Sequence, residues 1–187
     1  MRAVALVLCG LLAATSSLRA QSGRWPTALE ALDLEPLAGD WFEVATSGSW
    51  SHRRCTSDTR FNWTVTDART IDIRSACMTP SGEERRSGRI RAPSGPHRGR
   101  LSVRFAPALF AWLPAIWSDY WVLARDPGDR WLLVGDRART RLSVLSRWVS
   151  LDEASLARAL QMGRGQGFDV DRLVLVRQTG ASYGPVR

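Results

Sequence analysis

Apolar and polar residues alternate with a period of two along most of the chain between residues 40 and 146. Phe61, Trp63 and Val65, for example, are separated by Asn62 and Thr64. Such alternation is typical of a β-strand with one buried face. The pattern predicts eight short strands, at residues 41–45, 59–65, 71–74, 88–92, 101–105, 120–125, 131–135 and 142–146. Eight strands at short, even spacing indicate an antiparallel barrel or sandwich.

A helical pattern replaces the alternation after residue 150. Ser150 and Glu153 have the spacing of a capping box, and Gly163 predicts the end of the helix. The apolar stripe between them consists of Leu156, Ala159 and Leu160. A short ninth strand is predicted at residues 173–176. The sequence therefore predicts an all-β fold with one C-terminal helix.

Residues 1–20 have the pattern of a secretory signal peptide. Arg2 precedes an apolar run over residues 3–14, and Ala20 is a plausible cleavage position. The run is too short to span a membrane. Cys9 follows Leu8 where a lipoprotein signal needs a small residue, so we expect no lipid anchor. The mature protein is thus expected to be exported.

Removal of residues 1–20 leaves two cysteines, Cys55 and Cys77, on either side of a predicted hairpin. An exported protein with two cysteines most simply carries one disulfide. Two free thiols are the alternative.

The composition fits one soluble domain with an ordinary core. The chain has 187 residues, of which 44% are hydrophobic and 24% are charged. All 26 basic residues are arginine, and loss of Arg2 and Arg19 leaves 24 against 18 acids, a net charge of +6. Six arginines are concentrated in one region, namely Arg85, Arg86, Arg89, Arg91, Arg98 and Arg100. They suit anionic lipid or nucleic acid, but a chain without lysine also needs arginine on every solvated surface.

Groups for catalysis or metal binding are few. His52 and His97 lie far apart in polar segments, and no residues have metal-ligand spacing. Glu43 is the one carboxylate in the inward phase of a strand. It is expected either to orient a polar ligand group or to pair with an arginine. We expect no catalytic residue, no metal and no cofactor.

Several motifs occur in an order that resembles the lipocalin family, and within it the bacterial group related to apolipoprotein D. They are GDWFEVA at residues 39–45, YWVLARDP at 120–127 and LSVLSR at 142–147. The cysteines also fall where many members carry a pair. The resemblance covers about residues 33–178, which leaves 21–32 as an N-terminal segment and 179–187 as a flexible tail. Ser143 departs from the family, which usually has tryptophan there.

The resemblance implies an eight-stranded up-and-down β-barrel with the helix packed outside and a cup open at one end. Gly39, Trp41 and Arg147 would close the other end and serve a structural role. The alternation places Ala45 inward together with Trp41 and Glu43, and Arg104 outward. The expected ligand-binding residues are Phe61, Trp63, Val65, Ile71, Ile73, Ile90, Leu101, Val103, Phe105, Tyr120, Val122, Ser143 and Leu145.

Ten consecutive apolar residues, 108–117, join two of the predicted strands. The up-and-down order places them at the open end, near Trp50. They are expected either to fold over the mouth as a lid or to contact a membrane through Phe110, Trp112 and Trp117.

These observations predict a secreted, periplasmic lipocalin, associated with the outer membrane, that binds and carries a fatty acid or lysophospholipid for envelope lipid maintenance. Its expected partners are a hydrophobic small molecule or lipid and a membrane surface, with no nucleic acid; its oligomeric state is left open. One alternative is a calycin-type enzyme acting on a lipid or carotenoid through Glu43. The other, disfavoured by the signal peptide, is a basic barrel that binds nucleic acid.

Overall fold

Nine strands and one α-helix make up the fold in a computed structural model that describes residues 25–48 and 54–179. The strands are β1 (Gly39–Thr46), β2 (Ser57–Asp67), β3 (Thr70–Thr79), β4 (Gly82–Arg91), β5 (Arg100–Arg104), β6 (Ser118–Arg125), β7 (Trp131–Gly135), β8 (Leu142–Ser146) and β9 (Val174–Leu175). The helix is α1 (Glu153–Gly165). The predicted signal peptide, Trp50 and almost all of the predicted tail lie outside the described residues.

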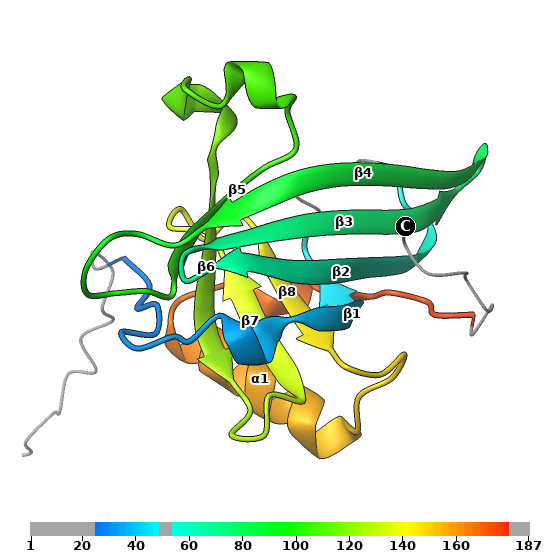
Figure 1. Ribbon diagram of the computed structural model, residues 1–187. Coiled ribbons are helices and arrows are strands. Elements are labelled where there is room, and N and C mark those ends of the chain that lie inside the picture. The colour runs from blue at the N-terminus through cyan, green and yellow to red at the C-terminus, as the bar shows by residue number, and fades with distance from the viewer. Residues whose placement is uncertain (1–24, 49–53, 180–187) are drawn as a thin grey trace, which may run out of the picture.

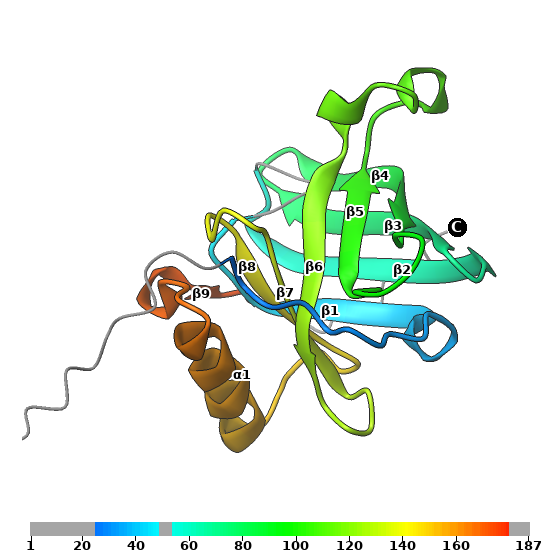
Figure 2. The same ribbon diagram turned by 90° about the vertical axis from the view of Figure 1, so that its left-hand side faces the viewer.

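The first eight strands form a closed antiparallel barrel, as predicted (Figure 1). Each strand from β2 to β7 pairs with the next along the chain, β8 pairs with β1, and β1 pairs back with β2. The short strand β9 pairs with the C-terminal end of β1, at Ala45 and Thr46, and is not one of the eight strands of the barrel. Figure 2 shows α1 lying against the outside of the barrel.

The fold has two buried apolar clusters, one on each face of the barrel wall. The first fills the barrel interior and includes Trp41, Trp63 and Tyr120. The second lies between the wall and α1, where Leu133 and Val144 meet Phe168. Strands β6, β7 and β8 are therefore largely buried on both faces, which explains why their alternation is weaker than that of β2.

Strands β3 and β4 are longer than the sequence predicted. They pair from Thr70 opposite Arg91 to Thr79 opposite Gly82. Most of β4 is polar and exposed on both faces, so it carries no apolar alternation that would reveal it. Strand β5 pairs with β4 only from Arg89 to Arg91, so the rest of β4 has no β5 partner.

The predicted start of the helix was wrong. Asp152 caps α1 and accepts a 2.8 Å hydrogen bond from the backbone N–H of Ser155. Gly163 lies inside the helix, at a position where a side chain would come within 3.0 Å of Leu142. The helix continues to Gly165, and the chain then turns at Gly167, whose φ is +82°.

Candidate ligand-binding site in the barrel

The structure brings the expected ligand-binding residues together inside the barrel. Two of them, Val65 and Phe105, are partly buried and pack against the interior cluster. The others are buried, namely Phe61, Trp63, Ile71, Ile73, Ile90, Leu101, Val103, Tyr120, Val122, Ser143 and Leu145. The strand register explains this, because Phe61, Trp63 and Val65 lie opposite Ser75, Ile73 and Ile71 in the β2–β3 pairing. Whether each side chain touches a ligand stays a prediction.

Three aromatic rings pack against one another in this interior. The ring centroids of Trp41 and Trp63 are 5.7 Å apart, and those of Trp63 and Tyr120 are 6.1 Å apart with an edge-to-face angle of 64°. Such contacts are favourable in addition to the area they bury. The indole N–H of Trp63 is buried and has no hydrogen-bond acceptor among the described residues. It is therefore an unsatisfied donor inside the barrel.

Arg147 covers Trp41 at the closed end of the barrel. Its guanidinium lies 3.7 Å from the centroid of the Trp41 ring, an approach at which cation–π attraction is strong. The same group donates hydrogen bonds of 2.7, 2.9 and 3.1 Å to the carbonyls of Pro36, Ala38 and Asp40. Gly39, with a φ of +102°, lets the backbone pass close beneath it. These contacts join the end of β8 to β1 and to the segment just before it.

Glu43 is buried in the barrel interior. It accepts a 2.6 Å hydrogen bond from the hydroxyl of Ser143, and that hydroxyl lies 2.8 Å from the hydroxyl of Thr46. Burial in an apolar interior raises the pKa of Glu43 to about 7, against the lowering effect of these hydrogen bonds. Among the described residues no ion pair to Glu43 is present, so the expected alternative of an arginine partner was not found.

Tyr120 shares the interior with this carboxyl. Its pKa is raised first by burial and then by the charge of Glu43. The arrangement can therefore hold a proton at the Glu43 carboxyl near neutral pH.

Thr46 was missed by the sequence reasoning, and the inward placement of Ala45 was wrong. The β1–β8 register shifts between Glu43 and Ala45, which indicates a bulge. The extra residue turns Ala45 toward the outer cluster, and Thr46 then lies opposite Ser143. Strict alternation gives no signal for such a shift.

A side cavity of about 310 Å³ reaches Glu43 where β1 and β2 separate. Strand β1 pairs with β2 only over Gly39–Phe42, and β9 pairs with β1 further along. Thr46 and Thr59 line the cavity from the barrel, and Val174 and Leu175 line it from β9.

The loop 108–117 extends away from the barrel instead of covering it. Figures 1 and 2 both show it projecting past the ends of β5 and β6. Leu109 and Trp112 are each 77% exposed and Phe110 is 44% exposed. Trp117 differs from them, because it is half-buried and its indole N–H donates a 3.0 Å hydrogen bond to the carbonyl of Ala111. The lid alternative is thus not what the structure shows, and Trp117 holds the loop.

The six clustered arginines all have partners within the chain. Three of them pair with acids, as Arg85 with Glu83, Arg86 with Glu84 and Arg89 with Asp72. Arg91 and Arg100 lie over the rings of Trp117 and Trp121. Arg98 donates hydrogen bonds to the carbonyls of Leu32 and Ala68. These contacts account for the cluster without a polyanionic partner.

The predicted disulfide between Cys55 and Cys77 is confirmed. It closes a loop with a sequence separation of 22 residues, which corresponds to about 3 kcal/mol in the chain-entropy model. A structural disulfide indicates an oxidising compartment. In the described part of the chain, no helix is long and apolar enough to cross a membrane, and no group of three or more metal-ligating side chains occurs there.

A closed β-barrel around an apolar, aromatic-lined interior defines a protein that binds small hydrophobic molecules. The model of the lipocalin-like domain family matches residues 32–178. The chain therefore belongs to the lipocalin family.

Individual relatives agree with this. The chain is 26% identical over 146 residues to temperature-induced lipocalin-1 of Arabidopsis thaliana, and the match covers 78% of each protein. The structure is similar to that of apocrustacyanin C1, with a TM-score of 0.63 and 14% identity over 84% of this chain and 92% of that one. It is also similar to the cockroach allergen Per a 4, with a TM-score of 0.62 and 17% identity over 83% and 94% of the two chains.

Proposed function

We propose that this lipocalin binds a fatty acid or a lysophospholipid in its barrel and carries it, without chemical change, between membranes. The motifs at 39–45, 120–127 and 142–147 resemble those of the bacterial members related to apolipoprotein D, which supports this proposal. With the signal-peptide pattern at residues 1–20, they support a role in envelope lipid maintenance in the periplasm and at the outer membrane.

The continuous apolar cluster inside the barrel is the observation that carries this proposal. Its residues are buried from the Trp41 end to Ile90 and Val103. Each methylene that leaves water for such surroundings contributes about 0.8 kcal/mol, so an acyl chain binds well without directed hydrogen bonds. Glu43 and Ser143 supply the polar point that a carboxyl or hydroxyl group of the ligand requires.

Two other classes of function have less support. An enzyme acting on a lipid or carotenoid would have Glu43 as its acid, and the hydrogen-bond partner found for that carboxyl is a serine hydroxyl. Turnover of a candidate lipid would distinguish an enzyme from a carrier. A nucleic-acid-binding barrel would need free arginines, and the clustered arginines have partners within the chain.

Native mass spectrometry of the mature protein, purified without added lipid, tests the proposal. We expect a population whose mass exceeds that of the polypeptide by one fatty acid or lysophospholipid. The protein stripped of lipid should regain that mass when oleate or lysophospholipid is added. A stripped, folded protein that takes up neither would contradict the proposal.

A further inference from the structure

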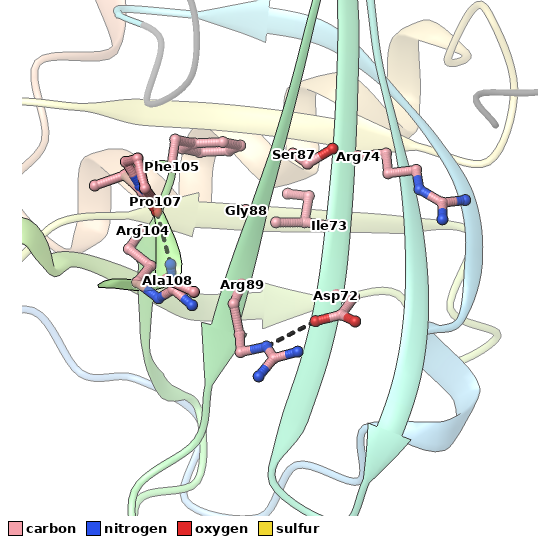
Figure 3. Close-up of a pocket in the computed structure, with 11 residues that line it drawn as sticks. Asp72, Ile73, Arg74, Ser87, Gly88, Arg89, Arg104, Phe105, Pro107 and Ala108 are labelled. Carbon is pink, nitrogen blue, oxygen red and sulfur yellow. Dashed lines mark hydrogen bonds and ion pairs between the residues drawn. The ribbon is translucent and has the colours of Figure 1, made fainter. Parts of the chain in front are cut away.

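A second cavity, of about 520 Å³, lies in the barrel wall where β5 leaves β4, and its lining includes Ile73 of the interior cluster and Phe105, which packs against that cluster (Figure 3). Strand β5 pairs with β4 only as far as Arg104 opposite Arg89, and beyond this point the two strands diverge. Gly88 permits a close approach, because a side chain there would clash with the carbonyl of Arg104. The diverging strands leave a space that opens to solvent.

Positive charge dominates the lining of this cavity. Arg74, Arg89 and Arg104 contribute to it, whereas Asp72 is the one acid among the described residues that line it. Asp72 accepts a 2.7 Å hydrogen bond from Arg89, which Figure 3 shows as a dashed line. Arg89 thus balances the acid, and the charge of Arg104 remains at this side of the cavity.

Arg104 is the most unusual of these residues. It is only 7% exposed, and its Nη1 donates a 2.6 Å hydrogen bond to the carbonyl of Ala106. Its Nε–H is buried and has no acceptor among the described residues. A buried cationic donor without an acceptor is costly, so an anion bound at this point would be favoured.

The cavity continues into the exposed apolar loop. Pro107 and Ala108 line the cavity, and the exposed Leu109 and Trp112 lie further along the same loop. At the other end of the loop, the ring of Trp117 lies 5.4 Å from the guanidinium of Arg104. Arg104 therefore lines the cavity and also contacts the base of the loop.

We propose that this cavity binds the phosphate of an anionic phospholipid in a bilayer while the loop 108–117 enters the membrane interface. Guanidinium groups bind phosphate oxygens with strong, directed hydrogen bonds. Tryptophan and leucine side chains are suited to the boundary between head groups and acyl chains. The inference extends the proposed carrier function, because it names the membrane lipid that the docked protein recognises.

Binding to vesicles provides the test. The mature protein is mixed at fixed salt with vesicles of phosphatidylcholine alone or with 30 mol% phosphatidylglycerol, in roughly the proportion needed to give a negative surface. Arg104→Gln should reduce the preference for the anionic vesicles about tenfold. The matched control is Arg158→Gln, which removes the same charge from an exposed position on α1, at the end of the molecule away from the loop. It should change the preference by less than about twofold.

Two further variants keep the test decisive if Arg104→Gln does not fold. Ser87 is exposed and lines the cavity, so Ser87→Glu should also weaken binding to anionic vesicles, whereas Gln161→Glu on α1 should not. Asp72→Asn should strengthen that binding, because it frees Arg89 from its acidic partner. Equal losses in the cavity and α1 variants would overturn the proposal in favour of general charge attraction.

Competition with a soluble phosphate distinguishes a phospholipid headgroup from free phosphate as the ligand. Excess glycerol phosphate should leave the binding to anionic vesicles almost unchanged, since the loop adds membrane affinity that a soluble phosphate lacks. Complete displacement at equal phosphate concentration would show a site for free phosphate and overturn the lipid assignment. Oleate binding in solution should be unaffected by Ser87→Glu, so a failure of the cup and a failure of this site give different results.

Discussion

The hydroxyl of Ser143 on β8 donates a 2.6 Å hydrogen bond to the carboxyl of Glu43 on β1, inside the barrel. The pair joins two neighbouring strands at a point where the interior is otherwise largely apolar. Because the carboxyl is buried without a cation in the described part of the chain, its charged form is disfavoured and its pKa rises to about 7. A change of pH near neutrality therefore changes the charge inside the cup.

The stability of the protein should fall as the pH rises from 5 to 8. Between the ordinary value of 4.5 and the folded value of about 7, the folded protein retains a proton that the unfolded chain has released. The free energy of unfolding then decreases by up to about 1.4 kcal/mol per pH unit, and by about 2 kcal/mol in all. Urea unfolding of Glu43→Gln should show a much smaller difference between the two pH values. The exposed control Glu153→Gln should behave like the unaltered protein, and an unchanged pH dependence in Glu43→Gln would contradict the assignment.

Replacement of Arg147 should destabilise the closed end of the barrel. Arg147→Lys keeps the charge, but a lysine ammonium cannot both stack on Trp41 and reach three carbonyl groups. The expected loss is about 2 kcal/mol in the free energy of unfolding, measured in urea. Arg158→Lys, at an exposed position on α1, should change it by less than about 0.5 kcal/mol. A loss for Arg147→Lys no larger than that of the control would show that the covering contact adds little.

A polar group in the interior of the barrel should weaken fatty-acid binding. Val103→Asn places an amide in the apolar cluster, and we expect at least about a tenfold loss of oleate affinity by fluorescence titration. Ser102→Asn, on the opposite face of the same strand, is the control and should bind oleate normally. Arg104, expected outward, is buried beside Trp117 and is not a suitable control. Equal affinities for the two variants, with the fold intact by circular dichroism, would place the ligand elsewhere.

The exposed loop should govern the rate of lipid delivery. A double variant, Phe110→Ser with Trp112→Ser, removes exposed apolar surface from the loop that projects past β5 and β6, so transfer of a labelled fatty acid to vesicles should slow several-fold. Its equilibrium affinity for soluble oleate should stay the same. Trp148→Ser with Val149→Ser removes a comparable exposed pair elsewhere and should transfer lipid at the normal rate. Normal transfer together with lost binding would show that the loop forms part of the pocket wall.

The alternation of residues identified the strands that bury one face. Phe61, Trp63 and Val65 had to face one side of β2 because side chains alternate along any extended strand, and the structure places them in the interior cluster or packed against it. The two cysteines likewise allowed a single disulfide once residues 1–20 were set aside. These features depend on local geometry and on counting, so the sequence was sufficient for them.

Tertiary structure alone decided which polar groups meet. The bulge in β1 brings Thr46 rather than Ala45 to Ser143, and the separation of β5 from β4 buries Arg104 at the base of the loop. Both results depend on how two strands far apart in the chain are paired. A period of two records which face of a strand is buried, but it contains no information on where the pairing shifts or ends. The sequence by itself therefore determined the barrel and its apolar interior. The hydrogen bond between Ser143 and Glu43 in the cup and the arginine cavity beside the loop arise only from the folded arrangement.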